Sequence, residues 1–328
     1  MAVLVTGGAG YIGSHTVAEL LDAKEEVIVL DNLEKGHKEA ISGGKFIQAD
    51  LRNIDEIRKV LTENEIEAVI HFAAYIEVGE SVINPLKYYN NNIIASLNLL
   101  SAMQEAGVNK IVFSSTAATY GIPESIPIKE SDKTAPINPY GETKLTVEKL
   151  LKWADNAYGI KYAVLRYFNA CGAHVSGKIG EAHSPESHLI PIILQVAQGK
   201  RDEIMIFGDD YNTKDGTCVR DYVHVSDLAQ AHVLALKNLR KGAESDIFNL
   251  GNGTGFSNRE VGEAARAETG KAIKATDAPR RPGDPDTLVA SAEKAISILG
   301  WKPKYNDLNK IIETAWNWHS THPNGYEE

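Results

Sequence analysis

Short apolar runs alternate with longer amphipathic segments through the first half of the chain, and this alternation predicts strands separated by helices. The predicted strands are β-branched or aromatic runs that end at a turn residue or a polar tip: Val3–Val5, Val27–Leu30, Phe46–Ile47, Ala68–Phe72, Ile111–Phe113 and Tyr162–Leu165. The predicted helices cover Ile12–Asp22, Ile54–Thr62, Asn92–Glu105 and Tyr140–Ala157. Because parallel strands need long crossovers that cover both faces of a sheet, we predict an α/β protein with a Rossmann-like, doubly wound parallel sheet.

The second half of the chain has a looser pattern, in which Gly, Pro, Asn and Asp become frequent after Phe168. Periodicity there predicts shorter helices over Ile190–Gln198, Asp227–Lys237, Asn258–Thr269 and Asn306–His319. The chain has 328 residues, whereas single cores stop growing at about 250–300 residues. We therefore predict a Rossmann domain over residues 1–170 and a smaller α/β substrate domain over residues 171–328, with residues 219–238 returning to the main sheet.

Composition and charge narrow the possible functions. The hydrophobic content of 43% and charged content of 24% are typical of a soluble globular protein. The formal net charge of −10 argues against binding to nucleic acid or to an acidic membrane surface, since both need a basic patch. Cys171 and Cys218 are too few for a disulfide framework or a zinc site built on cysteines, so we expect reduced thiols and no metal. The amino terminus has no signal-peptide pattern and no run is long enough to span a membrane, which predicts a cytoplasmic protein.

A glycine-rich segment follows the first predicted strand and opens the first predicted helix, reading Thr6-Gly7-Gly8-Ala9-Gly10-Tyr11-Ile12-Gly13. Glycine permits the tight turn, the close approach of a pyrophosphate and the packing of helix against strand. The helix amino terminus then offers free N–H groups and a positive dipole end to the phosphates. We infer a dinucleotide site here.

Asp31 stands at the tip of the second predicted strand, where its carboxylate can accept hydrogen bonds from an adenosine ribose. The same charge repels a 2′-phosphate, and Asn32 follows it rather than an arginine, so we predict NAD rather than NADP. Asp50, after the third predicted strand, is placed to touch the adenine.

Tyr140 and Lys144 are four residues apart, which puts the phenol and the ammonium on one helix face. A free tyrosine has a pKa of about 10, too high for a general base at neutral pH. A nearby lysine and a positive nicotinamide ring favour the phenolate. Thr116 follows the fifth predicted strand and would meet Tyr140 at the sheet edge, where its hydroxyl can relay a proton from the substrate.

These motifs together resemble a known family. Gly7–Gly13, Asp31–Leu33, His71–Ala74, Thr116 and Tyr140 with Lys144 resemble the extended short-chain dehydrogenases/reductases. Further stretches resemble UDP-galactose 4-epimerases: Leu165–Asn169, Gly172–His174, Phe207–Tyr211, Asp215–Thr217, Val219–Tyr222 and Arg280–Asp284. The likeness runs from Met1 to about Tyr326.

The resemblance implies roles position by position. Tyr140 would be the base, Thr116 its hydroxyl partner, and Lys144 the group that binds the nicotinamide ribose and lowers the tyrosine pKa. The residues implied to contact tightly bound NAD are Gly7, Gly10, Tyr11, Ile12, Gly13, Asp31, Asn32, Asp50, Leu51, Phe72, Ala73, Asn91, Tyr140, Lys144 and Tyr167. The residues implied to hold the UDP-sugar are Thr116, Asn169, His188, Leu189, Phe207, Arg220, Tyr222, Arg281 and Asp284. The role implied for Arg220 and Arg281 also follows from their chemistry, because the hydrogen-bond donors of a guanidinium group match the oxygens of a pyrophosphate.

Three positions depart from the family's pattern. Ile76 stands where many members have a lysine that approaches the ligand phosphate. His188 precedes Leu189 where asparagine is frequent. Leu288 takes the place of a bulky tyrosine that excludes N-acetylated sugars in some members, so we predict weak activity on UDP-N-acetylhexosamines.

The resemblance implies interconversion of UDP-glucose and UDP-galactose by oxidation at C4, rotation of a 4-keto intermediate, and reduction from its other face. A related dehydratase would carry Asp-Glu after Thr116, whereas this chain has Ala117-Ala118. A net NAD-dependent sugar-nucleotide dehydrogenase remains an alternative, and a non-catalytic NAD-sensing protein would not need Tyr140 and Lys144. The resemblance also implies a homodimer formed through the helices Asn92–Glu105 and Tyr140–Ala157.

Overall fold

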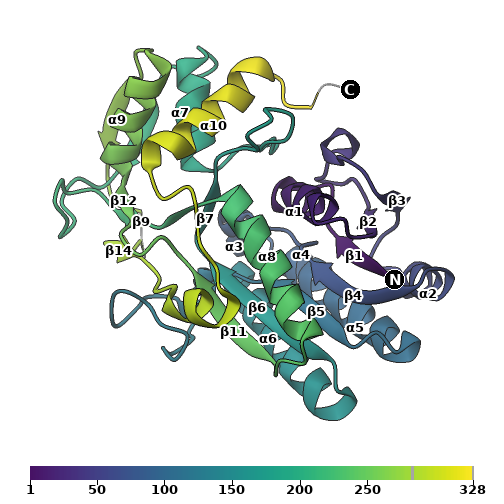
Figure 1. Ribbon diagram of the computed structural model, residues 1–328. Coiled ribbons are helices and arrows are strands. Elements are labelled where there is room, and N and C mark those ends of the chain that lie inside the picture. The colour runs from purple at the N-terminus through teal and green to yellow at the C-terminus, as the bar shows by residue number, and fades with distance from the viewer. Residues whose placement is uncertain (282–283, 327–328) are drawn as a thin grey trace.

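The computed structural model describes residues 1–281 and 284–326. Its main sheet has seven strands in the order β11-β6-β5-β4-β1-β2-β3, and every neighbouring pair in it is parallel (Figure 1). The strands are β1 (Ala2–Thr6), β2 (Val27–Asp31), β3 (Lys45–Gln48), β4 (Ile66–His71), β5 (Lys110–Ser114), β6 (Lys161–Tyr167) and β11 (Asp246–Leu250). This is the predicted doubly wound, Rossmann-like sheet.

Helices cover both faces of this sheet because its central strands are apolar on both sides, as in β1 and β2, where all residues are buried. On one face, α1 (Tyr11–Asp22) and α8 (Val225–Arg240) pack together over the strands. On the other face lie α2 (Ile54–Glu63), α5 (Ala95–Ala106) and α6 (Pro139–Tyr158). The helices lie on both faces of the sheet (Figure 1), and the two layers of apolar side chains packed between them form the main core.

Local sequence signals explain where the longest helix, α6, begins and ends. The Asn138 side chain caps it by accepting a hydrogen bond from the Gly141 amide at 2.8 Å, and Pro139 occupies its first position. Gly159 ends the helix in the left-handed conformation, with φ of 71°. The capped start holds Tyr140 in the first turn of the helix, beside the edge of the sheet.

Short elements connect the sheet to the rest of the chain. They are η1 (Lys38–Ala40), α3 (Val78–Ile83), α4 (Pro85–Tyr88), η2 (Tyr89–Ile94), η3 (Ala117–Tyr120), β7 (Asn169–Cys171), β10 (Tyr222–His224) and η4 (Ala295–Leu299). Strands β7 and β10 pair in parallel and lie between the main sheet and the smaller unit (Figure 1).

The smaller unit has its own apolar core between three helices, α7 (Leu189–Ala197), α9 (Asn258–Thr269) and α10 (Leu308–Thr321). Two small sheets accompany them: β8 (Ile204–Phe207) with β13 (Ala275–Ala278), and β9 (Val219–Arg220) with β12 (Phe256–Ser257) and β14 (Thr287–Leu288). A capping box between Ser257 and Glu260 starts α9.

The expected strands and helices recur with boundaries shifted by one to three residues, but the sequence analysis missed β11 (Asp246–Leu250). This strand lies at the sheet edge beside β6, and α8 before it packs on α1. The chain therefore returns to the main sheet with both a helix and a strand. The proposed domain division at residue 170 stays a prediction.

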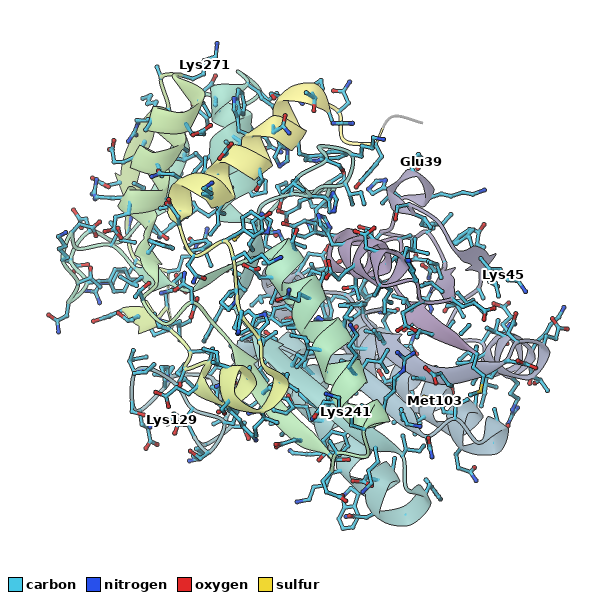
Figure 2. The ribbon with its side chains drawn as sticks, in the orientation of Figure 1. Glu39, Lys45, Met103, Lys129, Lys241 and Lys271 are labelled. Carbon is cyan, nitrogen blue, oxygen red and sulfur yellow. The ribbon has the colours of Figure 1, made fainter. Side chains whose placement is uncertain are left out.

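Most charged side chains lie at or near the surface. Glu39, Lys45, Lys241 and Lys271 all point away from the body of the protein (Figure 2). Cys171 and Cys218 are buried free thiols. Among the residues that the structure describes, no helix combines the length and apolar character that a bilayer crossing needs.

Candidate active site

The glycine segment forms the turn between β1 and α1, and the structure shows why two of its glycines are required. Gly7 has φ of +73°, and a Cβ there would lie 2.5 Å from the amide nitrogen of Ala73. A Cβ on Gly13 would lie 2.2 Å from the Gly7 carbonyl oxygen. Gly10 differs, since its added Cβ would meet only the Gly7 oxygen, at 3.3 Å. Gly7 and Gly13 thus bring β1, α1 and the end of β4 into contact that a side chain would prevent.

This arrangement fits a dinucleotide. The backbone amides of Tyr11, Ile12 and Gly13 open α1, where an α-helix has no internal acceptors for its first N–H groups. Phe72 and Ala73 border the same turn, because both of their amides donate to the Thr6 carbonyl, at 2.9 and 3.2 Å. The segment therefore presents glycine backbone and helix N–H groups at the carboxyl ends of β1 and β4, where a pyrophosphate binds in such sheets.

Asp31 is held rigidly at the end of β2. One carboxylate oxygen accepts the Ala9 amide at 3.0 Å and the other accepts the Leu33 amide at 2.9 Å. Burial raises the pKa of Asp31, while these two hydrogen bonds oppose the rise. An added Cβ on Gly36 would lie 3.0 Å from the Asp31 carboxylate. The carboxylate is thus closely packed beside the glycine turn, as expected for a group that accepts a hydrogen bond from a ribose hydroxyl.

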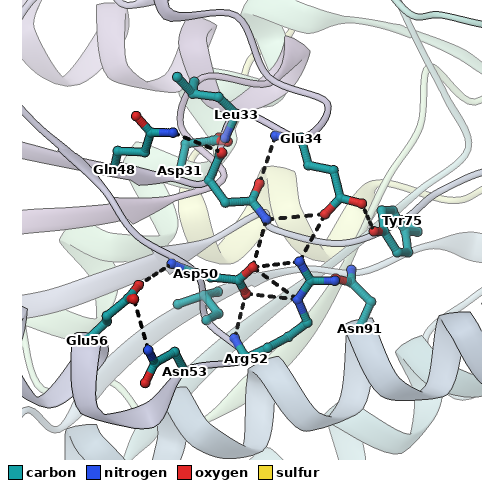
Figure 3. Close-up of polar contacts among 12 residues, drawn as sticks. Asp31, Leu33, Glu34, Gln48, Asp50, Arg52, Asn53, Glu56, Tyr75 and Asn91 are labelled. Carbon is teal, nitrogen blue, oxygen red and sulfur yellow. Dashed lines mark hydrogen bonds and ion pairs between the residues drawn. The ribbon is translucent and has the colours of Figure 1, made fainter.

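A polar network surrounds Asp50 near the tip of β2 (Figure 3). Arg52 donates to its two carboxylate oxygens, at 2.9 and 2.6 Å, and Asn32 donates to it at 3.2 Å. These contacts, the Arg52 hydrogen bonds above all, hold the pKa of Asp50 at about 2 despite partial burial. Arg52 also pairs with Glu34, which accepts the Tyr75 hydroxyl. Asp50 is therefore ionised and fixed, and Leu51 beside it is buried.

The three residues predicted to be catalytic lie together at the carboxyl end of β5. The Thr116 hydroxyl lies near the Tyr140 phenol. The Thr116 oxygen also accepts the Ala118 amide at 3.1 Å, which fixes its rotamer. Burial raises the pKa of Tyr140 to about 12, and the contact with Thr116 opposes that rise. In the chain alone, therefore, burial outweighs any effect of Lys144 on the phenol.

Lys144 lies one helical turn after Tyr140 and is buried. Its ammonium donates to the Ser114 carbonyl at 2.9 Å and stands 5.0 Å from the centre of the Phe113 ring. Burial lowers the pKa of Lys144 to about 7, while the Glu148 carboxylate acts in the opposite direction. Lys144 is thus held in a fixed position by the Ser114 carbonyl, one helical turn from Tyr140.

Tyr167 and Asn91, both predicted to contact NAD, lie near this group. Tyr167 ends β6, and its hydroxyl group is hydrogen-bonded to the Ser114 side chain. Burial raises the pKa of Tyr167, and a charge on Tyr140 would raise it further, so the two phenols are close neighbours. Asn91 lies in η2 and donates to the Asn92 side chain at 3.1 Å. Asn92 in turn donates to Thr143, which places η2 against the start of α6.

The residues predicted to hold the sugar nucleotide fall into connected pairs. Asn169 and Tyr222 are register partners in β7 and β10. Arg220 is held by the carbonyls of Val219 and Pro285, both at 2.9 Å, and by Asp284 at 3.5 Å.

The guanidinium of Arg281 stacks on the Phe207 ring at 3.9 Å. Leu288 is the register partner of Arg220 in β14. It also packs against Ala117 and Tyr120, the residues after Thr116. The structure thereby links the predicted arginine site to the catalytic edge of the sheet. Pro282 and Gly283 of this motif lie outside the described residues.

His188 and Leu189 mark the start of α7, and His188 belongs to a cluster that the sequence analysis did not identify. Its Nδ1 lies 2.8 Å from Glu181 and 3.0 Å from Glu186. Burial lowers the pKa of His188, but these carboxylates raise it well above the ordinary value overall. His183 contacts the same Glu181 oxygen at 2.9 Å.

Sequence reasoning also missed Glu148, which pairs with Arg166 beneath the catalytic residues. The sequence did show a charged residue four positions after Lys144, on the same helix face. Its partner Arg166 is identified only when α6 packs on β6.

Comparison with known proteins agrees with this geometry. The model of the NAD dependent epimerase/dehydratase family matches residues 3–251. A UDP-glucose 4-epimerase from Halalkalibacterium halodurans is 60% identical over 326 residues, covering 99% of this chain and 98% of that protein.

Two solved structures are also similar to this chain in both fold and sequence. The crystal structure of a UDP-glucose 4-epimerase has a TM-score of 0.98 and 55% identity, with 100% of both chains covered. That of the Brucella ovis UDP-glucose 4-epimerase in complex with NAD has a TM-score of 0.95 and 45% identity, covering 96% of this chain and 97% of that one. These findings confirm the predicted resemblance to UDP-galactose 4-epimerases (also called UDP-glucose 4-epimerases), the Rossmann-like fold, and an enzyme that depends on NAD.

Proposed function

The chain belongs to the NAD dependent epimerase/dehydratase family, and within that family we propose that it interconverts UDP-glucose and UDP-galactose. The observation that carries this proposal is the placement of Thr116 beside the Tyr140 phenol, at the strand ends near the glycine turn. Ala117 and Ala118 follow Thr116. Their methyl groups supply no acid or base for the C5 proton removal that a dehydratase needs.

In the proposed mechanism, bound NAD would supply the acceptor for the hydride of sugar C4 and the donor for its return. Thr116 and Tyr140 move the proton of the 4-hydroxyl group: Thr116 accepts the hydrogen bond from the sugar and Tyr140 takes the proton. Since the pKa of Tyr140 is about 12 in the chain alone, the base must be activated by positive charge on its neighbours. The Lys144 ammonium and the oxidised nicotinamide are the two sources of that charge.

The remaining residues are proposed to anchor the cofactor and the UDP end of the substrate firmly, while the hexose end is held loosely. Asp31 receives the adenosine ribose, and the amides that open α1 bind the pyrophosphate of NAD. Arg220 and Arg281 clamp the diphosphate of the sugar nucleotide, because each guanidinium is already oriented by its neighbours. Firm anchoring of UDP leaves the 4-keto hexose free to turn over and present its other face, so that reduction yields the opposite configuration. NAD is regenerated in each cycle and stays tightly bound.

The alternative is a net sugar-nucleotide dehydrogenase, and one experiment separates the two. The purified protein is incubated with UDP-galactose without added NAD, and the products and the ultraviolet spectrum are followed. Epimerisation predicts UDP-glucose with no accumulation of NADH. If product forms only with added NAD, and NADH accumulates with it, the proposal is wrong. Tyr140→Phe should reduce kcat by about 10²–10⁴-fold, whereas Tyr158→Phe, at the exposed end of the same helix, should leave it nearly unchanged.

We also propose weak activity on UDP-N-acetylhexosamines. Leu288 lies beside Arg220 and packs on the residues that follow Thr116, so its side chain borders the space for the hexose. Leu288→Tyr should reduce turnover of UDP-N-acetylglucosamine at least tenfold while leaving UDP-glucose turnover nearly unchanged. Absence of any N-acetyl turnover by the wild-type enzyme would contradict this proposal.

A homodimer is proposed from an exposed apolar surface. It is contributed by α3, α4, η2 and α5, which lie beside α6, and consists of Val82, Ile83, Leu86, Ile94 and Leu97. Contiguous apolar side chains of this kind mark protein–protein contacts. Leu97→Lys should convert the dimer to a monomer in light scattering, whereas lysine at Ile122, an exposed apolar position after η3, should not. A wild-type monomer at micromolar concentration would refute the proposal.

A further inference from the structure

Four potential metal ligands converge in the segment between β7 and α7. They are Glu181, His183, Glu186 and His188, and one ligand atom from each lies within 4.8 Å of all the others. The proposed reaction assigns a role only to His188, as a substrate contact. The other three side chains therefore need a separate explanation.

Three of the four distances between histidine nitrogens and carboxylate oxygens in the cluster are those of ordinary hydrogen bonds, and the fourth is longer. The Nδ1 atoms of His183 and His188 lie 2.9 and 2.8 Å from the same Glu181 oxygen. They lie 3.8 and 3.0 Å from the oxygens of Glu186. Bonds of about 2.0–2.2 Å to a tetrahedral zinc ion place neighbouring ligand atoms roughly 3.4 Å apart. The observed separations lie on both sides of that value, so small movements would complete a tetrahedron.

The burial and charge of the two carboxylates also favour a bound cation. The side chains of Glu181 and Glu186 are each only 4% exposed. Two buried carboxylates are costly unless positive charge is close. A protonated His188 offsets one of these charges, whereas a divalent cation offsets both. The histidines are less buried than the carboxylates, and His183 lines a hollow beside the glycine turn.

The backbone that carries the cluster is held by contacts outside it. The Trp318 indole donates to the Glu181 carbonyl at 3.1 Å, and a ring nitrogen of His37 lies 2.9 Å from the Ala182 carbonyl. Lys35 donates to the Ser184 carbonyl at 3.2 Å. These contacts come from α10 and from the segment after β2. The ligands are thus presented by a segment whose position does not depend on the cluster itself.

We propose that Glu181, His183, Glu186 and His188 form a structural site for one divalent transition metal, with zinc as the ion that two imidazoles and two carboxylates fit best. Four protein ligands close the coordination sphere, so the ion would serve stability rather than catalysis. It would fasten the segment that leads into Leu189 and hence the start of α7. This site goes beyond the proposed epimerase reaction and does not depend on it.

The test uses the full-length protein, stripped with a chelator and then dialysed against Zn²⁺. Elemental analysis should find one zinc ion per chain. The melting temperature should rise by about 4 °C when free zinc reaches a hundredfold excess over its dissociation constant. Co²⁺ in place of zinc should give the visible absorption bands of a tetrahedral centre.

Two variants and one control locate the ion. His183→Gln and Glu186→Gln should each lower zinc affinity at least tenfold and remove the melting shift. His174→Gln replaces a half-buried histidine of the same connecting segment, bonded to Ser176, and should bind zinc as the wild type does. The proposal is overturned if the wild type binds no zinc, or if the two variants keep full stoichiometry and affinity. The Co²⁺ spectrum of the wild type tests the proposal even if a variant fails to fold. A wild-type spectrum without tetrahedral bands also overturns the proposal.

Discussion

Replacing Glu148 by glutamine changes one oxygen for an NH₂ group inside the core and leaves the shape of the side chain intact. In the native protein, Glu148 accepts from Arg166 at 3.0 Å and from Ser115 at 2.5 Å. Both members of the ion pair are almost completely buried, with side chains 4% and 3% exposed. The substitution therefore leaves the Arg166 guanidinium, which stands 4.8 Å from the Tyr120 ring, without a countercharge.

The magnitude follows from this burial. Removing one partner of a buried pair costs about 3–5 kcal/mol of unfolding free energy, because the remaining charge stays desolvated. A chain of 328 residues unfolds with an entropy of about 0.7 kcal/mol per degree. Glu148→Gln should therefore lower the melting temperature by about 4–7 °C. Ser115 precedes Thr116, so the catalytic hydroxyl should also become less well positioned.

Differential scanning calorimetry and urea unfolding provide the assay. The control is Glu142→Gln, in the first turn of the same helix, which should cost less than about 1 kcal/mol. Replacing Glu148 and Arg166 together by methionine should recover much of the loss, since no buried charge then remains. The reasoning is refuted if Glu148→Gln melts within 1 °C of the wild type, or if the double variant is less stable than Glu148→Gln.

Three further predictions concern the reaction, the glycine turn and acid stability. Tyr140→Phe should reduce kcat by about 10²–10⁴-fold while the purified protein still carries NAD; unchanged kcat would contradict the role of the phenol. Gly13→Ala should cost at least 1–3 kcal/mol by overpacking, because its Cβ would meet backbone at 2.2 Å, whereas Gly10→Ala should leave the unfolding free energy nearly unchanged; equal urea midpoints would refute this steric account. Burial lowers the pKa of His71 from 6.5 to about 3, so the unfolded chain takes up a proton that the folded protein excludes, and the stabilisation present above pH 6.5 is lost toward pH 3. Over that range the slope of unfolding free energy against pH should be smaller in His71→Gln than in the wild type by about 1.4 kcal/mol per pH unit, and equal slopes in urea unfolding would contradict it.

Local patterns were sufficient for most elements of the fold but not for the edge strand β11. Its residues, Asp246–Leu250, contain only one fully apolar pair of neighbours, and the strand is recognised by its pairing with β6. Asn249 illustrates the reason. Its polar side chain can be buried because both of its groups have hydrogen-bond partners. It accepts from the Tyr120 hydroxyl at 2.7 Å and donates to the Ile128 carbonyl at 3.1 Å. Both partners lie more than a hundred residues away in the chain, so no local pattern records them.

The sequence by itself determined the features that depend on near neighbours. The glycine turn, the strand-end position of Asp31 and the four-residue spacing of Tyr140 and Lys144 follow from backbone sterics and helix periodicity, which act over a few residues. These local signals were enough to predict the sheet, the NAD site and the enzyme family.

Only the tertiary structure decided the properties that depend on packing between distant segments. It brought Thr116 to Tyr140 and gave Glu148 its partner Arg166. It also set the pKa of Tyr140 at about 12, because burial is a property of everything that surrounds a side chain. Desolvation and contacts at long sequence separation depend on the folded shape as a whole, and for that reason they could not be read from residue order alone.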